Sequence, residues 1–291
     1  MTVTEVYGAG PTRRRRRTKA EIQAIKNAIY DVAATDHPMT LRGVFYRLVS
    51  QGVVAKTEAE YDSTVGRLLL ELRRDGTVPY QWIADGTRLM RKPSTWEGLE
   101  DVLYYTAQHY RRAVWDHQPA YVEVWSEKEA IAGILHQVTA EWDVPLMIAR
   151  GFSSETFLWS AAQEIKRIAK PTFLYHFGDH DPSGVAAANA IERRLHEFAP
   201  DAEITFVRAA VTLDQIEEWN LPTRPTKRTD SRAKNWAGGS VEVDAIPPRL
   251  LRGLVEECVT RHVDRAEHDL LLEIEAQERE DLIRLTEEYV P

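Results

Sequence analysis

The sequence is poor in cysteine and has no long apolar runs. One cysteine, Cys258, stands among 291 residues, so an internal disulfide is excluded and a reducing compartment fits. No apolar stretch approaches the roughly 20 residues that a membrane-spanning helix needs. The arginines near the start are not followed by the apolar segment of a secretory signal. We therefore expect a soluble protein of the cytoplasm that does not enter a membrane.

Positive charge is scarce overall but is concentrated in the first part of the chain. The net charge is −8, yet residues 1–120 carry 18 Lys and Arg against 14 Asp and Glu, whereas residues 121–291 carry 19 against 31. A basic N-terminal part beside an acidic remainder is compatible with local DNA binding. Chance asymmetry with an acidic, solvated C-terminal helix is the alternative on charge alone.

Residues 1–18 read as a disordered basic arm. Gly, Pro and Thr surround an uninterrupted basic run, which consists of Arg13, Arg14, Arg15, Arg16 and Arg17. Such an arm can neutralise DNA phosphates without reading the base sequence. A solubilising tail is an equally good interpretation of the run alone.

Residues 19–92 carry the pattern of a small helical domain. Apolar residues at helical spacing predict helices over 20–34, 41–52 and 57–76. Residues 77–88 then read as two short extended pieces around an Asp–Gly turn. Three helices followed by a hairpin are the element order of a winged-helix domain, and many such domains lay the third helix in a DNA major groove. Others mediate only protein contacts.

Strands and helices alternate in the second part of the chain. This alternation predicts an α/β region, a mostly parallel sheet covered by helices, over residues 121–262. The expected strands are 120–127, 144–151, 171–181 and 202–211, with a short further strand at 241–248. A linker and helix, residues 93–120, precede this region, and an acidic helix, residues 263–291, follows it.

Acidic residues stand where two of the predicted strands end. Glu127 follows the first strand, and Asp179 and Asp181 follow the third. In open sheets of this kind the ligand lies at the carboxyl ends of the strands. Paired carboxylates repel each other unless a cation or proton lies between them, and Mg²⁺ prefers oxygen ligands. The pattern therefore predicts a Mg²⁺ site, with Mn²⁺ as a substitute, suited to phosphoryl transfer.

Zinc is the lesser alternative in the same stretch. His176 and His180 share one face of a strand, but no cysteine or third histidine joins them.

Tyr46 is a candidate nucleophile in the second predicted helix. Arg42 and Arg47 flank it. A tyrosine hydroxyl beside arginines can attack a phosphodiester and form a phosphotyrosyl bond. Taken alone, the same residue reads more readily as a core aromatic.

A polar loop over residues 220–240 is rich in basic side chains. It carries Arg224, Lys227, Arg228, Arg232 and Lys234. The loop could contact DNA, or it could be a mobile insertion without that role.

Together these motifs resemble the A subunit of topoisomerase VI and its relative, the meiotic double-strand-break protein. The segment from Arg42 to Tyr46 is similar to the tyrosine motif of that family, and Glu127 with Lys128 to its first Toprim motif. The segment from Asp179 to Gly184 matches Asp-x-Asp-Pro-x-Gly, and residues 241–248 look like a late Glu-x-x-Ala segment. The order agrees over roughly residues 20 to 260, and the length resembles the compact forms called Topo mini-A.

The resemblance implies a winged-helix domain, a Toprim domain and a Mg²⁺-dependent DNA-cleaving transesterase of the isomerase class. It implies that Tyr46 attacks the scissile phosphate and remains covalently linked to the 5′ end of the cut strand. Arg42 would stabilise the charge that develops on the phosphate. Glu127 would assist proton transfer and hold the metal with Asp179 and Asp181. We expect DNA contacts from Arg13, Arg14, Arg15, Arg16, Arg17, Arg47, Arg67, Arg88, Lys128, Lys227, Arg228, Arg232 and Lys234.

The expected partners are double-stranded DNA and a second copy of the chain. The resemblance implies that the tyrosine of one subunit faces the metal of the other. We expect the dimer to be associated with the nucleoid. The chain has no GHKL-type ATPase, so strand passage would require a separate ATPase subunit. Two alternatives stay open: a Toprim-type hydrolytic nuclease of mobile-element or defence origin, in which Tyr46 is structural, and a non-catalytic DNA-binding module.

Overall fold

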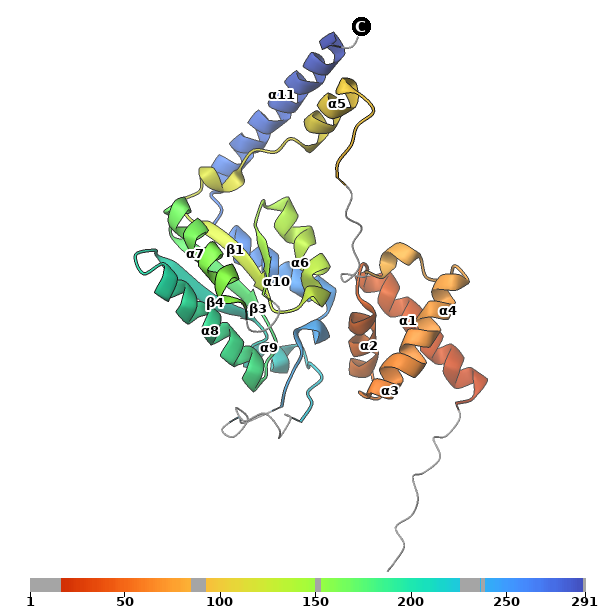
Figure 1. Ribbon diagram of the computed structural model, residues 1–291. Coiled ribbons are helices and arrows are strands. Elements are labelled where there is room, and N and C mark those ends of the chain that lie inside the picture. The colour runs from red at the N-terminus through yellow and green to blue at the C-terminus, as the bar shows by residue number, and fades with distance from the viewer. Residues whose placement is uncertain (1–16, 85–92, 150–152, 226–235, 237–238, 290–291) are drawn as a thin grey trace, which may run out of the picture.

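The structure, a computed structural model, describes residues 17–84, 93–149, 153–225, 236 and 239–289. Helices make up the described N-terminal part, which lies to one side of a sheet with helices on both faces (Figure 1). The helices of this part are α1 (Lys19–Asp36), α2 (Leu41–Ser50), α3 (Glu58–Glu60) and α4 (Arg67–Arg74), with a π-helical turn at Tyr61–Gly66. The helices predicted over residues 20–76 are thus confirmed.

Side-chain caps fix where the first two helices begin. The Thr18 hydroxyl accepts from the Glu21 N–H at 3.2 Å, and a Glu21 carboxylate oxygen accepts from the Thr18 N–H at 2.6 Å, which completes a capping box. The Thr40 hydroxyl accepts from the Gly43 N–H at 3.0 Å and starts α2. The cap at Thr40 fixes the start of the helix that carries Tyr46.

The prediction of extended pieces over residues 77–88 is wrong in its described half. Tyr80–Trp82 forms a 3-10 turn, and Ile83 makes only an isolated parallel bridge with Met39. Pro79 has φ near −57° and its carbonyl accepts from the Trp82 N–H at 3.1 Å. Proline fixes that dihedral and so favours a turn over a strand. The remainder of the predicted hairpin, with Arg88, lies outside the described residues.

The described part of the α/β region contains a parallel sheet in the order β2-β1-β3-β4. This confirms the α/β prediction at the level of a helix-covered parallel sheet. Its strands are β1 (Tyr121–Ser126), β2 (Leu146–Ile148), β3 (Thr172–Phe177) and β4 (Ile204–Ala210). The helices around it are α6 (Glu129–Glu141), α7 (Glu155–Ile168), α8 (Pro182–Phe198), α9 (Leu213–Glu218) and α10 (Pro248–Thr260).

Alternating residues of β1 build two apolar layers, one on each face of the sheet. Val122 and Val124 join the layer under α6 and α10, whereas Trp125 joins the layer under α7 and α8 (Figure 1). Successive side chains of a strand point to opposite faces, so a strand covered on both sides is apolar throughout. Glu123 and Ser126 are the polar exceptions in β1, and Glu123 carries a carboxylate although it is only 3% exposed.

The strand predicted at residues 241–248 is absent from the described structure. Ser240 and Val241 make isolated antiparallel bridges, and Val243–Ala245 forms a 3-10 turn. The Val243 N–H donates to the Asp179 carboxylate at 2.9 Å instead of to a neighbouring strand. The segment therefore bends toward the carboxyl end of β3, where Asp179 lies.

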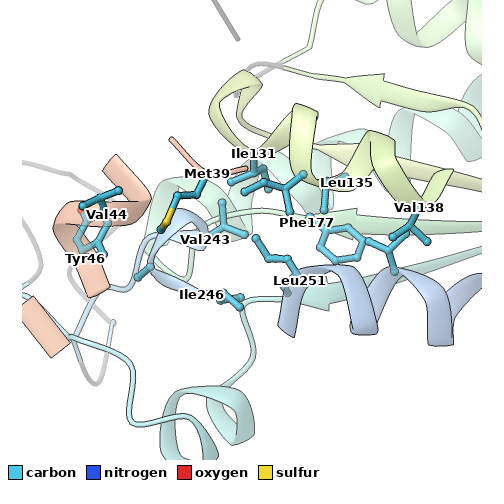
Figure 2. Packing of buried hydrophobic residues seen from close by; sticks show 14 of the residues in the cluster. Met39, Val44, Tyr46, Ile131, Leu135, Val138, Phe177, Val243, Ile246 and Leu251 are labelled. Carbon is cyan, nitrogen blue, oxygen red and sulfur yellow. The ribbon is translucent and has the colours of Figure 1, made fainter. Parts of the chain in front are cut away.

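Apolar contacts join the N-terminal helices to the α/β region. Figure 2 shows Val44 and Tyr46 of α2 on one side of Val243, with Leu251 and Phe177 on the other. The turn after residue 240 therefore fills the space between the two parts, and the buried cluster runs through both of them.

Two helices stand away from the sheet at the far end of the molecule (Figure 1). They are α5 (Leu99–His109), which lies within the predicted linker and helix of residues 93–120, and α11 (Arg265–Tyr289). The Tyr110 hydroxyl donates to Glu278 at 2.7 Å, and the Arg112 N–H donates to Glu275 at 2.8 Å. No helix in the described part of the chain is long and apolar enough to cross a membrane.

Candidate active site

The first and third strands end at the point where the strand order reverses. The chain leaves β1 for β2 on one side, and β3 lies on the other side of β1. Open parallel sheets bind ligands at such a switch point. Glu127 follows β1 and Asp179 lies just beyond β3, and the Asp179 N–H donates to a Glu127 carboxylate oxygen at 2.9 Å. The structure thus brings these two predicted residues into contact.

The turn after β3 is tightly packed against Glu127. A Cβ atom at Gly178 would lie 2.6 Å from a Glu127 carboxylate oxygen, and one at Gly184 would lie 2.5 Å from the Asp179 carbonyl oxygen. Both distances are shorter than a side chain allows, so close approach of the backbone requires glycine here. Asp181 caps α8, because its carboxylate accepts from the Gly184 N–H at 2.8 Å.

Lys128 neutralises the acidic cluster. Its Nζ lies 2.9 Å from an Asp179 oxygen, 3.0 Å from Asp244 and 3.2 Å from Glu242. Burial acts to lower the pKa of Lys128, but the charges of Asp244, Asp179 and Glu242 outweigh it and raise the pKa above its usual value. Lys128, which we expected to contact DNA, is therefore a charged ammonium that pairs with three carboxylates of the site.

Glu242 is the most heavily engaged carboxylate of the site. One of its oxygens lies 2.5 Å from Arg224 Nη1, and the other lies 3.3 Å from Arg42 Nη1 and 3.2 Å from Lys128 Nζ. The charge of Glu242 also acts on the Tyr46 phenol and raises its pKa. Burial favours the protonated form of Glu242, yet Lys128 and Arg224 lower its pKa to about 2.

Tyr46 is buried, with 5% of its surface exposed. Burial raises the pKa of its phenol, and the negative charges of Glu242 and Asp244 raise it further. The Lys56 ammonium lies 5.0 Å from the centre of the Tyr46 ring, within the range of a cation–π contact. In this arrangement the phenol is protonated at neutral pH.

A cavity of about 600 Å³ opens beside Tyr46. Arg42 of α2 and Lys56 of the connection between α2 and α3 border it on one side, and Asp179 and Glu242 border it from the α/β region. The resemblance implied a tyrosine facing the carboxylates of another subunit. In the structure, Tyr46 and Asp179 of a single chain border the same cavity.

The three predicted metal ligands lie in one neighbourhood but serve other contacts. The Asp179 carboxylate accepts from Lys128 and Val243, and Asp181 caps α8. Burial and then the charge of Asp179 raise the pKa of Glu127, and Asp181 adds to this. Among the described residues, no group of three or more His, Cys, Asp or Glu is arranged to hold a metal ion. The donor chemistry itself, oxygen alone, suits Mg²⁺.

Within the described residues, no third ligand joins His176 and His180 at the position of the zinc alternative. His176 is fully buried and its ring nitrogens have no hydrogen-bond partner within the described structure. Burial lowers its pKa to about 3, so the ring is neutral.

The basic residues expected at DNA are dispersed. Arg17 pairs with Glu60 at 2.9 Å, Arg47 with Asp36 at 3.0 Å, and Arg67 with Glu71. The others lie outside the described residues: Arg13, Arg14, Arg15, Arg16, Arg88, Lys227, Arg228, Arg232 and Lys234.

The ion pair between Arg47 and Asp36 gives a stability prediction. Asp36 is 2% exposed, so Arg47→Met leaves a buried carboxylate without its cation. We expect the free energy of unfolding at pH 7 to fall by about 2 kcal/mol, less than for a fully buried pair because Arg47 is partly exposed. Urea unfolding measures this, and Asp36→Asn in the same chain should recover most of the loss. An unchanged midpoint for Arg47→Met would contradict it.

Sequence reasoning missed Lys56 and gave no role to Glu242 and Asp244. Lys56 stands in a short connection without a motif, so no sequence signal was available for it. The acidic pair was visible as alternating Glu and Asp before Pro247, in a segment interpreted as a strand and as the late Glu-x-x-Ala segment of the resemblance. Arg224 was noted as one of several loop cations.

Comparison with known proteins adds nothing to these motifs: no protein-family model matches the chain, and no curated protein matches it.

Proposed function

We propose that this chain is a Mg²⁺-dependent DNA-cleaving transesterase in which Tyr46 is the nucleophile. One observation carries the proposal: a tyrosine hydroxyl, the Arg42 guanidinium and the Asp179 carboxylate border one cavity at the switch point of a parallel sheet. Nucleophile, phosphate-binding cation and acidic residues are the parts that phosphoryl transfer requires.

The reaction exchanges one phosphodiester for another. The Tyr46 oxygen forms a bond to phosphorus, and the bond from phosphorus to the 3′-oxygen breaks, which leaves the protein on the 5′ end. The phenol proton passes to solvent, and Glu127 protonates the departing 3′-oxygen. Arg42 stabilises the charge that develops on the phosphate oxygens.

Glu127, Asp179 and Asp181 would hold Mg²⁺, and Mn²⁺ would be a substitute. The metal would supply charge stabilisation on the phosphate oxygens. Lys128 has to give up Asp179 for this, and Asp244 and Glu242 remain available to it at 3.0 and 3.2 Å.

Double-stranded DNA is the proposed substrate, and the working form is a homodimer at the nucleoid. A double-strand break needs one site for each strand, and a two-fold dimer provides two sites in matching orientation. Strand passage would require a separate ATPase subunit.

A hydrolytic Toprim-type nuclease is the second candidate, and the burial of Tyr46 favours it. A side chain that is 5% exposed, with a raised phenol pKa, also fits a core aromatic. In that case water attacks the phosphate and no covalent adduct forms.

Tyr46→Phe separates the two functions. The change removes one oxygen, so we expect covalent protein–DNA adducts to vanish and cleavage of supercoiled plasmid to fall at least roughly 10³-fold, while duplex affinity stays within about threefold. Denaturant-trapped adducts on labelled DNA measure the first effect. Tyr121→Phe is the matched control, because burial also raises the pKa of Tyr121, which lies at the opposite end of β1.

The outcomes are distinct. Cleavage by Tyr46→Phe at the wild-type rate would support the nuclease and end the transesterase proposal. A wild-type protein that binds duplex but neither cuts nor forms an adduct, with Mg²⁺ or Mn²⁺ present, would leave a DNA-binding module.

A further inference from the structure

Four cations border the cavity beside Tyr46, and three of them, Lys128, Arg42 and Arg224, pair with carboxylates. Lys128 is matched by Asp179 and Asp244. Arg224 pairs with Glu242 at 2.5 Å, and Arg42 contacts the same carboxylate at 3.3 Å. Both guanidinium groups thus converge on one side chain.

Lys56 is the cation that lacks an acidic partner. Its Nζ donates to the Pro222 carbonyl at 3.0 Å, and in the part of the chain that the structure describes it makes no ion pair within 4 Å. Burial lowers the pKa of Lys56, while Glu242 acts to raise it. An ammonium that borders a cavity without a carboxylate in contact is ready to receive an anion.

Glu242 presents to these donors what a phosphate would present. A carboxylate and a phosphodiester both offer two negatively charged oxygens to the planar fork of an arginine. Glu242 pairs with Arg224, Arg42 and Lys128, and it borders the same cavity as Tyr46. A phosphate at that position would touch both guanidinium groups in the cavity that Tyr46 also borders. The cavity of about 600 Å³ has room for a nucleotide-sized group.

We propose that the Glu242 carboxylate stands in for a DNA phosphate in the free protein, and that Lys56 and Arg224, together with Arg42, bind the phosphate that displaces it. The inference rests on the proposed function for the identity of the ligand, a backbone phosphate of duplex DNA. It adds two phosphate-binding residues, and it makes Glu242 a competitor of DNA.

A competing interpretation makes the opposite prediction for one variant. If Glu242 only orients Arg42 and Arg224, its loss should weaken DNA binding. If Glu242 competes with phosphate, Glu242→Gln should strengthen binding, because the amide keeps the shape and removes the charge. The sign of the effect therefore decides between the two.

The test measures binding of a fluorescein-labelled 30-base-pair duplex to the full chain in EDTA, at several salt concentrations. We expect Glu242→Gln to tighten binding roughly tenfold and Lys56→Met to weaken it roughly tenfold, the worth of about one charge-assisted hydrogen bond. Lys56→Met should also lower the log–log salt slope by about 0.9, one phosphate contact. Lys26→Met is the control, because Lys26 pairs with Glu71 away from the cavity. It should change binding less than twofold.

Weaker or unchanged binding by Glu242→Gln would overturn the inference, and so would an unchanged salt slope for Lys56→Met. The assay needs no cleavage, so its result is independent of Tyr46 chemistry. Tighter binding by Glu242→Gln in a protein that never forms an adduct would keep the phosphate site and end the proposed function. An adduct at Tyr46 with weaker binding by Glu242→Gln would keep the function and end this inference.

Discussion

Chains that carry both Asp179→Asn and Asp181→Asn should bind duplex DNA and leave it uncut. The amides keep the acceptors for Val243 and Gly184, at 2.9 and 2.8 Å, so folding should be preserved. They remove the charges that would hold Mg²⁺, and we expect cleavage to fall at least roughly 10³-fold. Conversion of supercoiled plasmid to nicked and linear forms, with Mg²⁺ and with Mn²⁺, measures the effect.

The control for this prediction is the DNA affinity of the same variant in EDTA. An affinity at or above that of the wild type, with a normal unfolding midpoint, assigns the loss to the chemistry. Cleavage by the double variant at the wild-type rate would contradict the assignment of Asp179 and Asp181 as metal ligands.

The same variant tests whether one chain builds a whole site. Tyr46 and Asp179 of a single chain border the cavity, so a mixture of the double variant with Tyr46→Phe chains should not recover nicking. Recovery of nicking in mixed dimers would show that subunits share their sites, as the resemblance implies.

Glu123→Gln should make the protein more stable at pH 8 and change its stability much less at pH 5. Glu123 is 3% exposed in the layer under α7 and α8, and its carboxylate accepts from the Trp125 indole N–H at 2.7 Å. Burial raises the pKa of Glu123 to about 7, although the Trp125 hydrogen bond acts against this.

The direction follows from the difference in pKa between the two states. The folded-state pKa of Glu123, about 7, lies above its ordinary value of 4.5, so the folded protein binds the proton more tightly. Stability is therefore fully present below pH 4.5 and is lost as the pH rises toward 7. At pH 8 the ionised carboxylate costs roughly 3 kcal/mol, and a glutamine that keeps the acceptor should recover about 2 kcal/mol of it.

Guanidinium unfolding at pH 5 and pH 8 measures the effect. Glu275→Gln is the matched control, since Glu275 is also buried but pairs with Arg279 at 2.7 Å, and it should gain no stability at pH 8. Equal midpoints for the wild type and Glu123→Gln at both pH values would show that Glu123 is not a buried charge.

Local patterns predicted the helices, the strands and the end of the sheet at which Glu127 and Asp179 lie. Periodicity reports which face of an element is buried, and parallel strands bring their carboxyl ends to one edge, so these features follow from neighbours in sequence. The bend at residues 243–245 depends on an acceptor at Asp179, far away in the chain. No local pattern contains that partner, so the segment was interpreted as a strand.

The composition of the cavity was beyond sequence reasoning for the same reason. Arg42 and Glu242 meet across 200 positions, and Lys56 carries no motif. Hydrophobic patterns predict that the N-terminal helices and the α/β region pack together. Which charged side chains meet between them depends on the angle at which the two parts pack.

Because one buried cluster passes from Val44 through Val243 to Leu251, we expect the N-terminal helices and the sheet to unfold together. Pulling the parts apart would wet the apolar surface that joins them, at roughly 25 cal/mol for each Å² exposed. Separating the N-terminal helices from the sheet to admit DNA would therefore cost much free energy. Rotation of the Glu242 side chain exposes almost none of that apolar surface. The two parts therefore stay packed together, and DNA reaches Tyr46 through changes in side-chain rotamers.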